Sequence, residues 1–374
     1  MKTNRLRDIL LTLFGILALA IYVLACRPSF SPDGSRVVYT VIGDKQTRVM
    51  LYDIKNKHSE TLFVALSPSD HEITCSAQWL PNGQQVLING ESSIIILPVG
   101  SSKPARLIVL HEKVNEESMV FPLPVVGNNQ FLANKSDILR VNLETGETLK
   151  VAGKDKEDYV LLKGPGSQVF YAVLSGDHKE DKVLEIGRLD TETLARTPLI
   201  ELRPQEGQKF SPFLSAARDG NRLALTGRYQ DELQILIYRG LALEKTLSVA
   251  TKKSDIKLGN TEWSSDEKTI YAAFSRKLDN GDNAQYGVLG VPLNGDTIHE
   301  TLLFTGKAED GNDNSTNLFQ IALSPDGRRI AATSALHNPE DQALYLIDVG
   351  NAQWKVTKIP VPIMSDTESV AKKK

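Results

Sequence analysis

The stretch "SFSPDGSRVVYT" (residues 29–40) returns near the other end of the chain as "ALSPDGRRIAATS" (residues 322–334). Both read as an apolar strand, a tight polar turn and a second strand. In the Ser-Pro-Asp-Gly turn, proline presets φ, the aspartate side chain caps the turn, and glycine accepts a positive φ. The phrase therefore predicts a β-hairpin at each end of the chain.

Related phrases recur between these two hairpins. The seven copies begin at Ser29, Ala77, Leu123, Leu161, Phe213, Thr261 and Ala322. Each copy is followed by an aliphatic strand such as "VMLYDIKNK" and then by a fourth strand such as "ETLFVAL". Units of four short strands at a period of roughly 40–60 residues are typical of β-propeller blades. The sequence thus predicts an all-β, seven-bladed propeller of four-stranded antiparallel blades.

The first and last units share a phrase because they are neighbours in a closed ring. Each unit is complete from inner to outer strand, so we expect closure by face-to-face packing of the first and last blades, without strand exchange. Runs such as "LQILIYRG" supply apolar side chains for both faces of a blade. The turns "VGNN", "GPGS" and "SSDE" in units 3, 4 and 6 depart from the pattern, which leaves the blade count open by about one.

On these phrases the chain resembles the propeller repeats of TolB-like proteins and of the non-catalytic propellers in dipeptidyl-peptidase-type enzymes. The resemblance covers residues 27–360 and implies a propeller fold, but such propellers serve many functions. The Gly-His and Trp-Asp pairs of WD-type repeats are missing, so the repeats are WD40-like only in architecture.

The first 26 residues form a separate segment. Lys2, Arg5 and Arg7 precede an uncharged run from Ile9 to Cys26, which is long enough for a signal peptide or a transmembrane anchor. Basic residues before such a run predict a cytoplasmic N-terminus and an exported body. "VLAC" partly resembles a lipoprotein lipobox, so Cys26 is a candidate lipidation site; an uncleaved anchor is the alternative. Residues 361–374 are expected to form a disordered tail.

Composition argues against several function classes. The net charge is -3 and the charges are interspersed, which disfavours nucleic acid as a partner. A Gly-x-Ser-x-Gly nucleophile elbow is absent, so a serine peptidase is not expected. No histidine pair has zinc-ligand spacing, and we expect no cofactor and no catalytic residue.

Function then rests on the loops. Long segments join the second and third strands of several units and join one unit to the next, and strand alternation puts both sets on one rim. The candidate binding residues in these loops are Asp177, Asp279, Asp282, Asp310, Asp313 and His337. The acidic loops could hold calcium, although a solvated turn is favoured.

We expect a membrane-tethered, extracytoplasmic scaffold that binds an envelope or membrane protein, on the periplasmic or cell-surface side. The alternative is a propeller-type lyase or hydrolase with its site in the central channel. The sequence lacks clustered His, Asp and Glu residues at the unit starts, which favours the scaffold over the enzyme.

Overall fold

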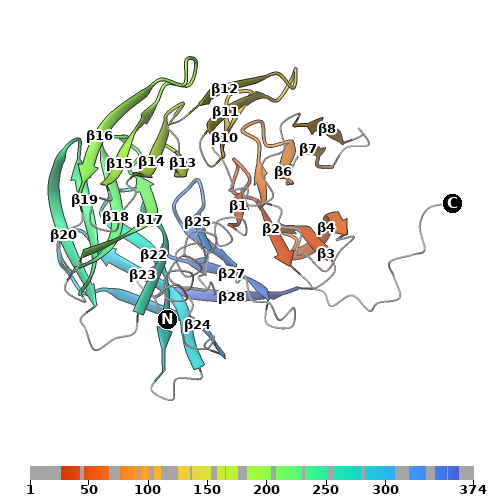
Figure 1. The fold of residues 1–374 in the computed structure, drawn as a ribbon. Coiled ribbons are helices and arrows are strands. Elements are labelled where there is room, and N and C mark those ends of the chain that lie inside the picture. Colours follow the sequence, from red (N-terminus) through yellow and green to blue (C-terminus); the bar gives the residue numbers. More distant parts are fainter. Residues whose placement is uncertain are drawn as a thin grey trace, which may run out of the picture.

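The structure is a computed structural model of the 374-residue chain. It describes residues 27–42, 46–66, 76–90, 93–100, 105–110, 125–134, 137–152, 158–164, 166–175, 183–203, 208–229, 232–250, 256–278, 283–307, 320–333, 342–351 and 353–361. These residues form seven four-stranded antiparallel sheets and contain no helix. The seven blades follow one another round a ring (Figure 1), which confirms the predicted fold class and blade count.

Each blade takes four consecutive strands in order from the innermost to the outermost. The strands of blades 1 to 4 are β1 (Ser29–Phe30), β2 (Arg36–Ile42), β3 (Gln46–Asp53), β4 (His58–Leu66), β5 (Ser76–Trp79), β6 (Gln85–Asn89), β7 (Ser93–Pro98), β8 (Arg106–Val109), β9 (Val125–Val126), β10 (Asn129–Asn134), β11 (Asp137–Asn142), β12 (Thr148–Ala152), β13 (Asp158–Lys163), β14 (Val169–Ser175), β15 (Val183–Leu189) and β16 (Arg196–Leu202). Those of blades 5 to 7 are β17 (Gln208–Ala216), β18 (Arg222–Tyr229), β19 (Glu232–Arg239), β20 (Ala242–Ala250), β21 (Ile256–Trp263), β22 (Thr269–Lys277), β23 (Asn283–Pro292), β24 (His299–Lys307), β25 (Gln320–Leu323), β26 (Arg329–Thr333), β27 (Ala343–Asp348) and β28 (Lys355–Pro360).

The Ser-Pro-Asp-Gly turns form as the sequence predicts. In blade 1 the hydroxyl of Ser31 donates to Asp33 Oδ1 over 2.5 Å and accepts from the backbone N–H of Arg36 over 2.9 Å. Gly34 takes φ +70°, a backbone conformation that glycine adopts without steric cost. In blade 7 Ser324 and Asp326 repeat the arrangement, with a bond of 2.6 Å. The turn therefore satisfies its own polar groups and fixes where the second strand begins.

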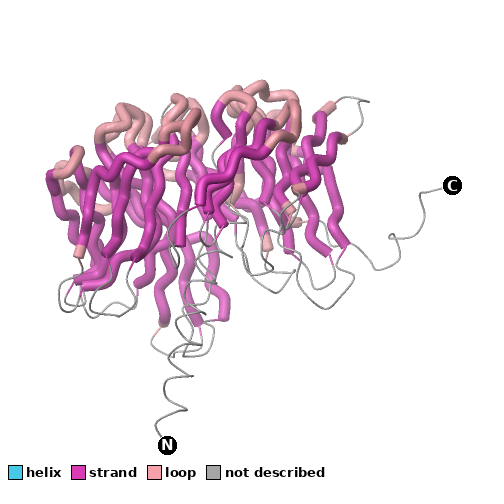
Figure 2. Tube along the Cα trace, turned by 45° about the horizontal axis from the view of Figure 1, so that its top comes forward, coloured by secondary structure: helices cyan, strands magenta, loops and turns pink. Residues whose placement is uncertain are grey.

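The described turns gather at one rim of the ring, which Figure 2 shows along its upper edge. They join the first strand of a blade to the second, and the third to the fourth. The second and fourth strands end at the opposite rim, because neighbouring strands in a blade are antiparallel. We call the rim that carries the described turns the short-turn rim. Each of these turns joins two strands of the same blade through a short stretch of chain.

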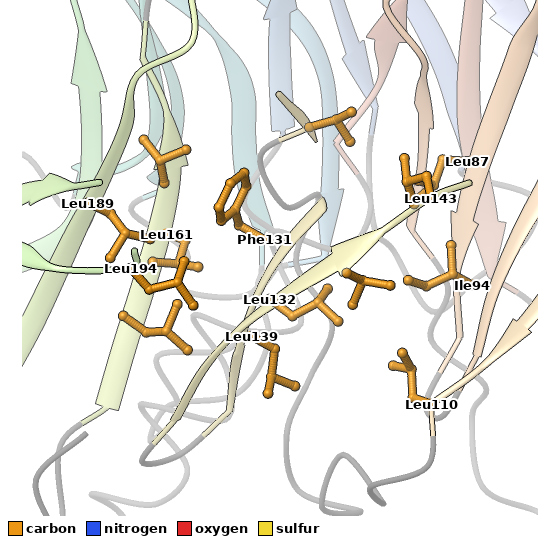
Figure 3. Close-up of a cluster of buried hydrophobic side chains, with 14 of the residues drawn as sticks. Leu87, Ile94, Leu110, Phe131, Leu132, Leu139, Leu143, Leu161, Leu189 and Leu194 are labelled. Atoms are coloured by element: carbon orange, nitrogen blue, oxygen red, sulfur yellow. The ribbon is translucent and has the colours of Figure 1, made fainter. Parts of the chain in front are cut away.

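The core lies in layers between the blades. Buried apolar clusters join every pair of neighbouring blades, and one of them extends across blades 2, 3 and 4. In that cluster Phe131 lies between Leu87 of blade 2 and Leu161 of blade 4 (Figure 3). Each blade thus buries both of its faces, which is why the third strands read as almost continuous apolar runs.

The ring closes between blades 1 and 7 by side-chain packing. Phe30, Val37 and Tyr39 of blade 1 share a buried cluster with Ala331 and Leu344 of blade 7. Each sheet contains strands from one blade alone, so the described residues show no exchange of a strand between the two ends of the chain. The predicted mode of closure is confirmed.

Candidate functional site

The residues predicted for the binding rim lie outside the described part of the chain. This holds for Asp177, Asp279, Asp282, Asp310, Asp313 and His337, and for the candidate lipidation site Cys26. The predicted anchor (residues 1–26) also lies outside it, as does the predicted tail (361–374) except for Val361, which is buried. Within the described ranges, no helix has the length and hydropathy required to cross a bilayer.

Histidine chemistry is sparse where the chain is described. His299 stacks on Trp354, with ring centroids 6.0 Å apart and an interplanar angle of 26°. His58 begins the outermost strand of blade 1 and is exposed. The described residues contain no group of three or more His, Cys, Asp or Glu side chains that could hold a metal ion.

Polar side chains link neighbouring blades through their first or second strands. Ser215 of blade 5 and Thr261 of blade 6 share a hydrogen bond of 2.8 Å between their hydroxyls. Gln130 of blade 3 donates to Asn89 Oδ1 of blade 2 over 2.7 Å. Main-chain ladders stop at the edge of each sheet, so side chains such as these provide polar contacts between blades.

An ion pair spans the start of the propeller and its sixth blade. The guanidinium of Arg27 donates to Glu262 Oε1, and both side chains are partly buried. Burial lowers the pKa of Arg27 to about 10, so the side chain stays charged at neutral pH. Glu262 belongs to the innermost strand β21, which ties residue 27 to the inner part of the ring.

On the short-turn rim, arginines from one blade bond to the turn of the next. Arg36 of blade 1 lies over the ring of Trp79 at 4.6 Å and donates to the carbonyl of Gly83 over 3.3 Å. Arg188 of blade 4 donates to the carbonyl of Gly220 in blade 5 over 3.0 Å. A guanidinium suits this role because it stacks on an aromatic ring while its N–H groups reach a carbonyl.

Blade 6 carries an acidic residue where other first turns have glycine. Glu267 adopts φ +57°, a left-handed conformation that costs a residue with a Cβ about 1–2 kcal/mol. Its carboxylate accepts a bond from Arg222 Nη2 and one of 3.1 Å from the backbone N–H of Asp219, both in blade 5. These bonds between blades offset the strain, which explains how "SSDE" replaces the usual turn.

A cavity of about 290 Å³ lies on the short-turn rim between blades 4 and 5. We call it the 4–5 cavity. Its lining residues are Arg188, Leu199, Gly220, Asn221, Leu223, Arg239 and Gly240. The two arginines are its charged lining residues. Leu199 and Leu223 add apolar surface.

Sequence reasoning did not find this cavity. Both arginines lie near the ends of third strands, in "IGRLD" and "IYRG". Third strands end at the short-turn rim, so this position in the sequence indicates that rim. Their convergence depends on how blade 5 is rotated against blade 4, and no sequence pattern specifies that rotation.

The class of protein that this architecture defines is the seven-bladed β-propeller. Within that class, the chain is similar to one in the crystal structure of a mitotic checkpoint complex, with a TM-score of 0.55 and 16% identity over 84% of this chain and 87% of that one. It is also similar to the Swd1 (Cps50) β-propeller domain of Myceliophteria thermophila, with a TM-score of 0.52 and 14% identity over 83% and 93% of the two chains. No family model and no curated protein matches the sequence. At such identities the likeness concerns the fold alone.

Proposed function

We propose that this chain is a membrane-tethered, extracytoplasmic scaffold that binds a protein partner through the rim opposite the short-turn rim. The observation that supports it is the difference in the length of the connections on the two rims. On the short-turn rim the described turns are compact and satisfy their own polar groups, as at Ser31 and Asp33. The longer connections, such as residues 176–182 and 308–319, leave from the other ends of the strands. Long loops on a rigid scaffold are where binding usually resides.

The apolar run before Cys26 motivates the tether. Only Arg27 and Pro28 separate Cys26 from β1 at Ser29, a span of about 10 Å at roughly 3.5 Å per residue. β1 begins at the rim where the second and fourth strands end. The proposed binding rim would therefore lie close to the membrane, within reach of an envelope or membrane protein. The TolB-like resemblance of the repeats agrees with an extracytoplasmic location.

The proposed rim is tested by insertion of a short epitope tag. A tag placed after Asp282 or after Asp313 should abolish capture of a crosslinked partner from intact membranes. The same tag after Gly295, in an open turn of the short-turn rim, should leave capture intact. Loss of capture with the Gly295 tag alone would overturn the assignment of the rim.

The tether has a separate test. If Cys26 carries a lipid, Cys26→Ser should abolish incorporation of radiolabelled palmitate and block cleavage of the leader. A wild-type protein without label that still sediments with membranes would support the uncleaved anchor instead. A protein recovered wholly in the soluble fraction would contradict both forms of the tether.

A second candidate is a lyase or hydrolase with its site in the central channel. The observation in its favour is the Glu262 carboxylate, which Arg27 holds on an innermost strand. Under this alternative, Glu262→Gln should abolish turnover of a polymeric substrate while partner capture is unchanged. Under the scaffold proposal, partner capture is the property of the protein and no turnover accompanies it.

A further inference from the structure

We propose that the 4–5 cavity binds an acidic side chain of a protein partner, an Asp or Glu carboxylate with an aliphatic residue next to it. This site lies on the short-turn rim, opposite the binding rim proposed above. The inference therefore does not depend on that rim, and its failure would leave the first proposal untouched. With about 290 Å³, the cavity is at the lower limit of small-molecule pockets. It suits one inserted side chain better than a sizeable ligand.

Arg188 supplies the fixed half of the cationic lining. One of its terminal nitrogens, Nη2, donates to the carbonyl of Gly220 over 3.0 Å, and its carbon Cζ lies 5.8 Å from the ring centre of Phe170. Its Nε–H is buried and has no acceptor. Arg188 lines the cavity, so its positive charge attracts an anion that enters. Because the side chain is already positioned, binding orders little further.

Arg239 supplies the adjustable half. It bonds to both carboxylate oxygens of Glu244 at 3.2 and 3.1 Å, and the two side chains are 55% and 39% exposed. Exposed ion pairs contribute little stability, so Arg239 can exchange this partner for an incoming carboxylate. Glu244 is thus an internal competitor for the site. A guanidinium binds a carboxylate through two parallel N–H groups, which gives the contact its geometry.

The apolar lining explains why an aliphatic neighbour is expected. Leu199 and Leu223 line the cavity, and Leu241 stands beside Gly240 with 76% of its surface exposed. Leu243, on the edge strand β20 that follows this turn, is also exposed. An aliphatic side chain next to the bound carboxylate would cover these leucines and exclude water from the ion pair, which strengthens it.

The test is fluorescence anisotropy with a fluorescein-labelled peptide of sequence Gly-Leu-Glu-Leu-Gly and its Gln counterpart. The full chain should bind the Glu peptide at least tenfold more tightly than the Gln peptide, and rising salt should weaken binding because the cavity is open to solvent. Arg239→Gln should weaken binding about tenfold, the loss of a charge-assisted contact. Glu244→Gln should strengthen binding several-fold, because it removes the competitor. A variant that merely disturbed the fold could not raise the affinity.

Arg36→Gln is the matched control. Arg36 makes the same kind of bond to the turn glycine of the next blade as Arg188 does, but it does not line the cavity. This variant should bind the Glu peptide as the wild type does. Equal affinity for the Glu and Gln peptides, or no response to Glu244→Gln, would overturn the proposal. Preference for a phosphoserine peptide with no binding of the Glu peptide would also overturn it, in favour of a phosphate site.

Discussion

Asn260 of blade 6 pairs with the main chain of Ile321 in blade 7 through both ends of its side-chain amide. Its Nδ2 donates to the Ile321 carbonyl over 2.7 Å, and its Oδ1 accepts from the Ile321 N–H over 2.8 Å. All of these groups are buried. These two hydrogen bonds link neighbouring blades as ladder hydrogen bonds link neighbouring strands within a sheet.

Asn260→Leu should therefore lower the free energy of unfolding by about 2–4 kcal/mol, because it leaves a buried N–H and a buried carbonyl without partners. Urea unfolding followed by tryptophan fluorescence measures the change. Thr297→Ala, at an exposed position of the same blade, serves as the control and should alter stability by less than about 0.5 kcal/mol. A loss equally small in Asn260→Leu would show that the bridge is dispensable.

The aspartates of the Ser-x-Asp turns predict a loss of stability in acid. Hydrogen bonds from Ser31 and Ser35 lower the pKa of Asp33 to about 2, and bonds from Ser264 and Ser324 lower the pKa of Asp266 and of Asp326. A carboxyl group whose pKa is lower in the folded state stabilises that state above its unfolded pKa of about 3.9. This contribution is lost as the pH falls from about 5 towards 2.

Replacing all three aspartates with asparagine should make the free energy of unfolding less dependent on pH in acid. Stability at pH 7 should fall, whereas the difference between wild type and variant should shrink at pH 3. Urea midpoints measured across that range provide the comparison. A difference that is constant between pH 3 and pH 7 would rule out the proposed role of these carboxylates.

At position 267 we expect substitution of the glutamate by glycine to be less destabilising than substitution by alanine. Glu267→Ala keeps the left-handed φ and loses both bonds to blade 5, whereas Glu267→Gly loses the bonds but relieves the strain. The glycine variant should therefore be more stable than the alanine variant by about 1 kcal/mol, as judged by thermal melts. An alanine variant as stable as the glycine variant would argue against strain at this turn.

Gly287 is required by close packing at a bulge. The register of β23 against β24 shifts between Tyr286 and Gly287. A Cβ at Gly287 would lie 2.2 Å from the carbonyl oxygen of Thr301 and 2.8 Å from the ring of Phe274. Gly287→Ala should destabilise the fold by about 1–3 kcal/mol. At Gly350 the nearest atom to such a Cβ is 3.4 Å away, so Gly350→Ala should be close to neutral in the same melts.

The fold could be read from the sequence because its signals are local. The Pro32-Asp33-Gly34 turn and the alternation of apolar residues around it specify a hairpin whatever surrounds them. Blade 6 shows the limit of that reading. Its turn departs from the repeated pattern, and in the structure Arg222 of another blade binds Glu267 there. The convergence of Arg188 and Arg239 is a relation between blades in the same way. The predicted rim residues, from Asp177 to His337, remain predictions.

In the described part of the chain blades 1 and 7 share no strand, and their boundary, like the other six, is packed with buried apolar side chains. Gly34 of blade 1 approaches Pro325 of blade 7, with 3.6 Å from a Cβ at the glycine to the proline ring, much as Gly83 of blade 2 approaches Pro32 at 3.5 Å. The packing between blades 7 and 1 is therefore of the same kind as the packing between blades 1 and 2. A circular permutant cut between any two blades would rebuild the same ring. Moving the cut would move the N-terminus to another arc of the propeller, so the order of the blades, and not their structure, decides which arc stands beside the proposed tether.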